Sequence, residues 1–226
     1  MHCGSTVWFE HHRTSRFTIC SSRERERERE GRAQVISGAR PFGGKGGASI
    51  WGKHKSVVQS TFYTVFDDSA APDAEAFTAL LRVSKKVVIW GGNFFLDHLG
   101  KATCMIVWDK GRRGLTQADC EIAWTNLKGQ SRIFDFKWNG MLQEDMKNKE
   151  VRIHATQKPV ALYKWLLNNY AKEGDLILDP YLGSGSSRIA AYDLGFDFVG
   201  YEINATIFAE QEERFRNHTA QTSLFV

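Results

Sequence analysis

The chain has 226 residues, of which 42% are hydrophobic, and a formal net charge of +4 at pH 7. This length suits one ordinary domain, alone or with a tail, and the hydrophobic content suffices for a core. No apolar run reaches the roughly 18 residues of a membrane-spanning helix, and the polar, arginine-rich N-terminus lacks the apolar segment of a secretory signal. The four cysteines have no metal-ligand spacing. We therefore expect a cytoplasmic protein with no metal site, and the positive charge permits a nucleic-acid partner.

The first 34 residues differ in composition from the rest of the chain. They contain the strictly alternating run RERERERE, from Arg23 to Glu30, and show no apolar periodicity. The charges of this run nearly cancel, so it is not a basic arm, and it cannot build a core. We expect residues 1–34 to be a disordered segment or a frayed helix, or not to be the native start of the domain; a DNA-contacting tail is the alternative.

Residues 35–226 are predicted to form a single domain in which short apolar strands alternate with helices. The predicted strands cover residues 34–36, 87–90, 105–108, 121–124, 133–138, 176–179 and 197–203. One helix is predicted to open at Pro72, and others cover residues 94–99, 159–170, 185–194 and 205–217. This alternation predicts an α/β fold with a Rossmann-like, doubly wound and mainly parallel sheet, because short continuous apolar runs are typical of strands covered on both faces.

The most informative segment is LILDPYLGSGSSRIAAYDLGFDFVGYE, residues 176–202. An apolar strand ends at Asp179, a turn with Gly183 and Gly185 leads into a helix, and the next strand ends at Glu202. Glycines let the backbone approach a ligand closely, and the start of the helix offers free N–H groups. A carboxylate after the next strand can hold ribose hydroxyls. The segment therefore predicts a nucleoside-cofactor site, with a simple tight turn as the alternative.

The spacing separates two kinds of cofactor. A dinucleotide fingerprint has three glycines directly after the strand, and Arg188 stands where the third would be. This departure disfavours a nicotinamide-dependent oxidoreductase, which we keep as an alternative.

A second motif, HATQKP at His154 to Pro159, ends 20 residues before Asp179. Together with the glycine loop it resembles S-adenosylmethionine-dependent DNA methyltransferases of the amino-group type, which make N6-methyladenine or N4-methylcytosine. The resemblance implies that S-adenosylmethionine is held by Asp179, Tyr181, Gly183, Gly185 and Glu202, with Thr156, Gln157 and Lys158 near its methionine end.

The cofactor half comes last in the chain, as in the circularly permuted beta group of this family. The resemblance thus implies a catalytic half at 35–150 and a cofactor half at 151–226. The catalytic motif of the family is Asp-Pro-Pro-Tyr or Ser/Asn-Pro-Pro-Tyr/Phe, and the matching place here is Ala39, Arg40, Pro41 and Phe42. Phe42 would stack on a flipped base. Ala39 cannot accept a hydrogen bond from the target amino group through its side chain.

The resemblance implies a site-specific methyltransferase that acts on adenine N6 or cytosine N4 of double-stranded DNA. The loss of an acceptor at Ala39 predicts a rate lowered on the order of 100- to 1000-fold, unless another group such as Ser37 serves. An inactive relative that binds cofactor or DNA is the first alternative, and a methyltransferase acting on RNA or protein is another. Target recognition would come from the loops at 43–60 and 111–150. The basic run at 110–113 would hold phosphates or be a solvated loop.

Overall fold

The computed structural model describes residues 6–10, 18–21, 72–114, 116–139 and 142–222. They belong to one compact unit, Met1–Ser22 with Tyr63–Val226. A second unit, Arg23–Phe62, lies outside the described residues. The strand expected at 34–36 and the catalytic segment expected at Ala39 to Phe42 therefore also lie outside the described residues.

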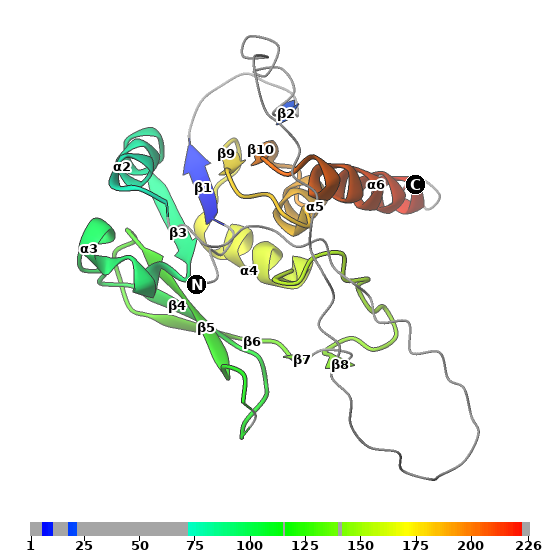
Figure 1. Cartoon of the computed structure of the whole chain (residues 1–226), viewed down its shortest axis with the longest axis horizontal. Coiled ribbons are helices and arrows are strands. Elements are labelled where there is room, and N and C mark those ends of the chain that lie inside the picture. The colour runs from blue at the N-terminus through cyan, green and yellow to red at the C-terminus, as the bar shows by residue number, and fades with distance from the viewer. Residues whose placement is uncertain (1–5, 11–17, 22–71, 115, 140–141, 223–226) are drawn as a thin grey trace, which may run out of the picture. The chain divides into compact units, whose positions relative to one another are not determined.

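Eight strands form one sheet in the order β2–β10–β9–β1–β3–β5–β4–β6 (Figure 1). The strands are β1 (Thr6–Glu10), β2 (Thr18–Ser21), β3 (Lys86–Trp90), β4 (Met105–Asp109), β5 (Cys120–Thr125), β6 (Arg132–Asp135), β9 (Leu176–Asp179) and β10 (Asp197–Glu202). A separate antiparallel pair joins β7 (Trp138–Asn139) to β8 (Leu142–Gln143).

The pairing within the sheet is mixed. Strands β2, β10 and β9 run parallel, as do β4 and β6. The pairs β9–β1, β1–β3, β3–β5 and β5–β4 are antiparallel. The α/β class is confirmed, whereas the expectation of a mainly parallel sheet is corrected to a mixed one. The physical reason is partly local: the connection from β4 to β5 spans only residues 110–119 and has no helix in its described residues, and a connection that short returns the chain antiparallel.

Strands β1 and β2 correct the expectation that residues 1–34 lack regular structure. Their sequences, TVWFE and TICS, are rich in β-branched and aromatic residues, which favour strands. Strand β1 pairs on both sides, with Trp8 opposite Val87 of β3 and opposite Leu178 of β9. The rest of this segment, including the alternating charge run, lies outside the described residues.

The helices are α2 (Ala74–Val83), η1 (Gly92–Phe94, a 3₁₀ turn), α3 (Leu96–Leu99), α4 (Val160–Tyr170), α5 (Ser186–Asp193) and α6 (Ala205–Thr222). Asp73 caps α2, because its carboxylate accepts a hydrogen bond from the Ala76 amide at 2.8 Å. Pro159 directly precedes α4, which confirms the helix predicted from that proline to Tyr170.

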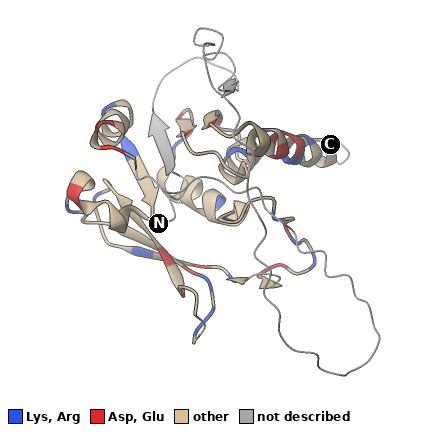
Figure 2. Ribbon diagram, in the orientation of Figure 1, with Lys and Arg blue, Asp and Glu red and all other residues tan. Residues whose placement is uncertain are grey.

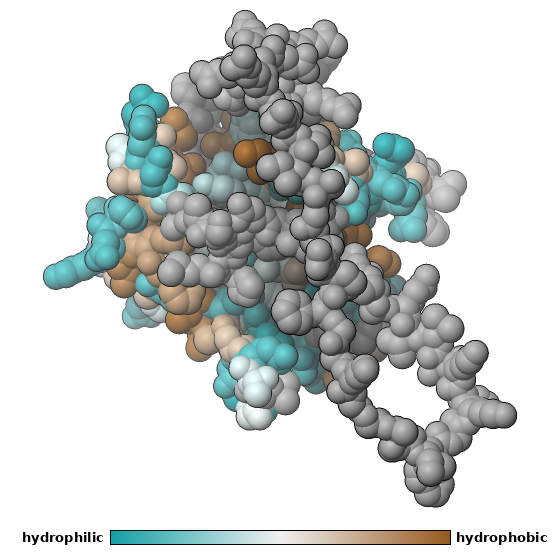
Figure 3. Space-filling model, in the orientation of Figure 1, coloured by the Kyte–Doolittle hydropathy of each residue, from teal (hydrophilic) through white to brown (hydrophobic). Residues whose placement is uncertain are grey.

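Alternate residues of β3 enter two different cores, as the two-residue period of a strand requires. Val88 and Trp90 pack with α4 and α5. Val87 and Ile89 pack with Phe77 of α2 and with residues of the η1–α3 segment. The helices thus cover both faces of the sheet. The hydrophobic surface in Figure 3 extends over the η1–α3 region, where Phe94 and Leu96 are exposed.

Across the described ranges, no helix has both the length and the apolar character that a membrane crossing needs.

Candidate functional site

The glycine loop connects β9 to α5 and is anchored at its start by Asp179. This side chain is fully buried, accepting hydrogen bonds from the Tyr181 amide at 3.0 Å and from the Ser187 hydroxyl. Burial raises the pKa of Asp179 to about 7, against these two hydrogen bonds and the positive charge of Lys158, which favour the ionised form. The Asp179 carboxyl group is therefore poised to change protonation near neutral pH.

Both predicted glycines have the backbone conformation that makes glycine necessary. The φ angles of Gly183 and Gly185 are 52° and 73°, in the left-handed region that other residues rarely adopt. A Cβ atom on Gly185 would lie 2.9 Å from Oε1 and 3.3 Å from Cβ of Gln211, so Gln211 of α6 would have to shift to admit a side chain. A Cβ atom on Gly183 would meet only the Tyr181 carbonyl oxygen, at 3.9 Å, among the described atoms. The space beside Gly183 is thus open to a ligand.

Glu202, at the end of β10, joins the second strand to the loop. Its Oε2 accepts a hydrogen bond from the Gly183 amide at 2.9 Å, and its Oε1 accepts one from the Asn204 amide at 2.9 Å. Each carboxylate oxygen can accept more than one hydrogen bond. Glu202 can therefore hold the loop and still accept from hydroxyl groups of a ligand.

The TQKP segment lies before α4, and its three predicted residues have different environments. Thr156 contacts the Nδ1 atom of His154 through its hydroxyl, at 3.1 Å. The Gln157 amide is buried and bonds to the backbone of Ile153 and Val151 at 2.9 and 3.2 Å, so it braces its own segment. Lys158 is 3% exposed, and its charge acts on Asp179. The charge of Lys158 thus acts on the start of the glycine loop, whereas Gln157 is occupied locally.

Glu121 of β5 forms a charged cluster with Lys158 and Lys110. Glu121 was not identified as a site residue from the sequence. Its Oε2 lies 3.2 Å from Nζ of Lys158, and its Oε1 lies 2.5 Å from Nζ of Lys110. Burial opposes ionisation of Glu121, but the charges of Lys158 and Lys110 outweigh it and lower the pKa of Glu121 to about 2. One carboxylate therefore serves two lysines, and the cluster keeps a net positive charge.

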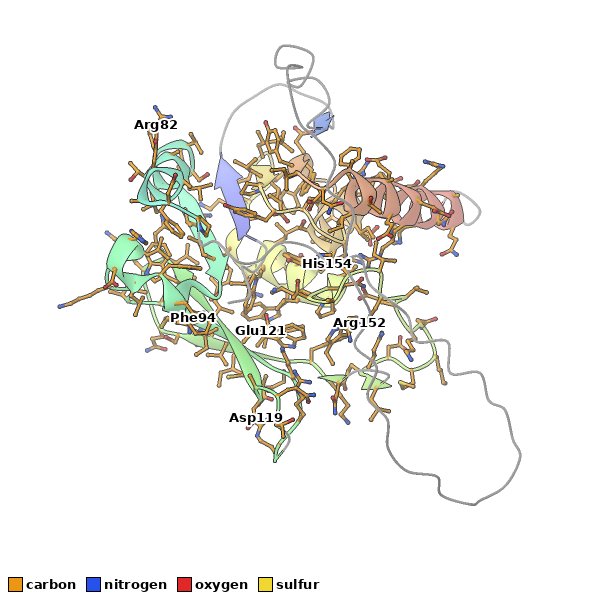
Figure 4. The ribbon with its side chains drawn as sticks, in the orientation of Figure 1. Arg82, Phe94, Asp119, Glu121, Arg152 and His154 are labelled. Carbon is orange, nitrogen blue, oxygen red and sulfur yellow. The ribbon has the colours of Figure 1, made fainter. Side chains whose placement is uncertain are left out.

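Aromatic and basic side chains surround this cluster. Nζ of Lys158 lies 6.0 Å from the ring centroid of Trp90, and Nζ of Lys110 lies 5.0 Å from that of Trp108. Burial lowers the pKa of His154, and the charges of Lys158 and Arg152 lower it further. Figure 4 labels Glu121 on β5 and His154 and Arg152 on the segment before α4. This side of the site favours anionic ligand groups.

The basic run at 110–113 divides into buried and exposed parts. Lys110 is buried, and its Nζ pairs with Oε1 of Glu121. Arg113 is exposed and pairs with Asp109, which also accepts a hydrogen bond from the Gly111 amide at 2.9 Å. These contacts hold the pKa of Asp109 at about 2.

Comparison with known proteins identifies the family. Residues 48–213 match the model of the DNA methylase family N6_N4_Mtase. The match spans well over half of the chain, so the protein belongs to this family of DNA methylases. It begins after residue 47, so Ala39 to Phe42 lie outside the matched residues.

Two curated relatives and one solved structure show how far the similarity extends. Type II methyltransferase M.HindIII of Haemophilus influenzae is 36% identical over 70 residues, 31% of this chain and 23% of the relative. Type II methyltransferase M2.DpnII of Streptococcus pneumoniae is 26% identical over 149 residues, 64% of this chain and 54% of the relative. The chain thus spans about half or less of the length of these relatives. The crystal structure of the M1.HpyAVI–SAM complex aligns with a TM-score of 0.47 and 22% identity, covering 64% of this chain and 83% of that one.

Proposed function

We propose that this protein is a DNA methyltransferase that uses S-adenosylmethionine to methylate the exocyclic amino group of adenine (N6) or cytosine (N4). The observation that carries the proposal is the loop between Asp179 and Glu202, with two left-handed glycines and open space beside Gly183. Membership of the DNA methylase family supports the same reaction.

The residues present fit this cofactor. Glu202 retains acceptor capacity for ribose hydroxyls, and the Gly183 region leaves room for the nucleoside. We expect Thr156 and Lys158 to lie near the methionine end of the cofactor, where the positive charge of Lys158 would favour its carboxylate. When bound, the cofactor supplies an electrophilic methyl group on a sulfonium ion. The loop residues Asp179, Tyr181, Gly183, Gly185 and Glu202 would bind and orient it, and Gln157 would brace the TQKP segment.

A nicotinamide cofactor fits less well. The position of the third fingerprint glycine holds Arg188, whose Nη1 bonds to Oε1 of Glu212 at 2.6 Å. The Arg188 side chain is buried and lies 3.7 Å from the ring centroid of Phe215. The helix start is therefore packed against α6 at the place where a pyrophosphate would need a close approach.

Double-stranded DNA is the proposed substrate. We also propose that the protein acts in restriction–modification and that it is located in the cytoplasm. Lys and Arg residues lie along the β4–β5 connection, among acidic ones (Figure 2). Exposed Arg113 and Lys137 in this region are suited to phosphate contacts. The family's catalytic position is assigned by sequence to Ala39 to Phe42, with Phe42 stacking on the target base. Because Ala39 lacks a side-chain acceptor, we propose slow transfer, and an inactive cofactor-binding relative is the second candidate.

The test is transfer of a labelled methyl group from S-adenosylmethionine to unmethylated duplex DNA, with cofactor binding measured on the same sample. In transfer the carbon–sulfur bond breaks, the nitrogen–carbon bond forms and the amino group releases a proton. Digestion of labelled DNA would identify the methylated base. Absence of both binding and transfer by a folded protein would overturn the proposal.

The variant Ala39→Asp separates slow transfer from a wrongly assigned catalytic segment. A gain of about 100-fold or more would support Ala39 as the defective position. No gain in a folded, cofactor-binding variant would count against this assignment and favour another group, such as Ser37.

A further inference from the structure

Arg214 of α6 contacts the glycine loop next to Gly183, the residue whose amide is bonded to Glu202. Its Nη1 donates hydrogen bonds to the Ser184 carbonyl oxygen at 2.7 Å and to the Ser186 hydroxyl at 2.9 Å. Ser184 lies between the two left-handed glycines, and Ser186 is the first residue of α5. Arg214 therefore bonds to the part of the loop where the chain turns into the helix.

Glu150 holds the Arg214 guanidinium group in place. Its Oε2 accepts a hydrogen bond from Nη2 of Arg214 at 2.7 Å, and its Oε1 accepts one from the amide of Val160, the first residue of α4. The backbone of Glu150 exchanges two hydrogen bonds with the Gln143 side chain, each 2.8 Å long. Contacts with Val160 and Gln143 thus hold Glu150 in position, independently of its ion pair with Arg214.

The contact is also well shielded from water. The side chains of Arg214 and Glu150 are 14% and 22% exposed. Burial lowers the pKa of Arg214 and raises that of Glu150, while each charge stabilises the other. Hydrogen bonds that involve a charged group in such surroundings are stronger than those between neutral groups.

We propose that Arg214, oriented by Glu150, is a positioning residue that sets the conformation of the cofactor loop at residues 183–187. The loop is held at one point by the Glu202 carboxylate on the Gly183 amide and at the next by the Arg214 guanidinium on the Ser184 carbonyl. The family match ends at residue 213, so this residue lies just outside it. The identity of the ligand as S-adenosylmethionine rests on the proposed function, whereas the role of Arg214 in holding the loop does not.

The first experiment measures hydrogen exchange of the backbone amides of 183–187 in the full chain without ligand. Arg214→Met is expected to raise the exchange rates of these amides at least about 10-fold. The matched control is Arg216→Met, on the exposed side of the same helix, and it is expected to leave the rates unchanged. Equal rates in wild type and a folded Arg214→Met variant would overturn the proposal. If that variant does not fold, Arg214→Lys and Glu150→Gln take its place, with the same criterion.

The second experiment measures the dissociation constants for S-adenosylmethionine and for duplex DNA. Arg214→Met is expected to weaken cofactor binding by about 10- to 100-fold, because it removes hydrogen bonds to a charged group that hold the loop, and to leave DNA affinity unchanged. Arg214→Lys, which keeps the charge, is expected to recover part of the loss. Equal weakening of both ligands would indicate general damage and contradict the proposal. A wild-type protein that binds no S-adenosylmethionine, with loop protection still dependent on Arg214, would overturn the proposed function alone.

Discussion

Lys158 of the TQKP segment and Glu121 of β5 form an ion pair in which the lysine is buried and the glutamate partly exposed, with 3.2 Å between Nζ and Oε2. The two residues come from different predicted halves of the chain. Glu121 also neutralises Lys110, so its carboxylate is the shared partner of two lysines whose side chains are 3% and 10% exposed. Removing it would leave two buried positive charges with one fewer partner, a change that costs more than the pair itself contributes.

We therefore expect Glu121→Gln to lower the free energy of unfolding by on the order of 2 kcal/mol. This figure is below that of a fully buried pair because the Glu121 side chain is 32% exposed. Urea unfolding at pH 7 measures the effect. Glu173→Gln, at an exposed glutamate, is the control and should change stability by less than about 0.5 kcal/mol. Equal stabilities of the two variants would contradict the assigned role of Glu121.

The raised pKa of Asp179 predicts a specific pH dependence of stability. The unfolded carboxyl loses its proton near its ordinary pKa of 3.8, whereas the folded one keeps it until about pH 7. Between these values the folded state binds more protons, so the contribution of Asp179 to stability falls as pH rises, by up to about 1.4 kcal/mol per pH unit. Asp179→Asn removes this contribution. The difference in unfolding free energy between wild type and variant should fall from pH 4 to pH 7 and be constant above; a constant difference throughout would refute the raised pKa.

Gly185 is predicted to be intolerant of any side chain for two reasons that can be separated. Alanine there would be strained at φ 73° and would also place its Cβ atom 2.9 Å from Gln211. Gly174 has φ 84°, but a Cβ atom added there would have nothing within 4 Å, so Gly174→Ala tests strain alone. We expect Gly174→Ala to cost about 1 kcal/mol, and Gly185→Ala to cost more and to weaken cofactor binding. Thermal unfolding and binding titrations compare the two variants. Equal losses of stability would show that Gln211 of α6 moves aside at little cost.

Glu202 is expected to act on both the loop and the ligand. Glu202→Ala removes the acceptor for the Gly183 amide and the proposed acceptor for ribose hydroxyls. We expect the dissociation constant for S-adenosylmethionine to rise by about 10- to 100-fold, which corresponds to roughly 1.4–2.8 kcal/mol. Glu202→Gln keeps one acceptor oxygen and should lose less. Isothermal titration calorimetry gives both constants, and an unchanged value for the alanine variant would remove Glu202 from the site.

The sequence predicted the local parts of this site and missed the long-range ones. The order of β9, glycine loop, α5 and β10 follows from apolar runs and glycine positions within a short stretch, and Pro159 indicates the start of α4. By contrast, Glu121 sits 37 positions before Lys158 and reads only as one acidic residue in a strand. Arg214 and Glu150 are 64 residues apart, and a charged final helix gives no indication of which arginine turns inward.

The topology was missed for a similar reason. The apolar character of β4 and β5 predicted strands but not their direction, which depends on the connection at 110–119. The insertion of β1 between β3 and β9 depends on hydrogen bonds to strands about 80 and 170 residues away, and no local pattern encodes such a pairing. The prediction for residues 1–34 rests on the alternating charges of Arg23 to Glu30 and does not use the strand propensity of TVWFE.

The alternation of β3 between two cores has a consequence for how related chains can diverge. Inserting or deleting one residue within Lys86–Trp90 would exchange the faces of every later side chain in the strand, sending Trp90 out of the core under α4 and α5. Changes of chain length should therefore be excluded from this strand and concentrate in connections such as 110–119. Among homologues, insertions and deletions should then lie in the loops around the site, and the length of β3 should be constant.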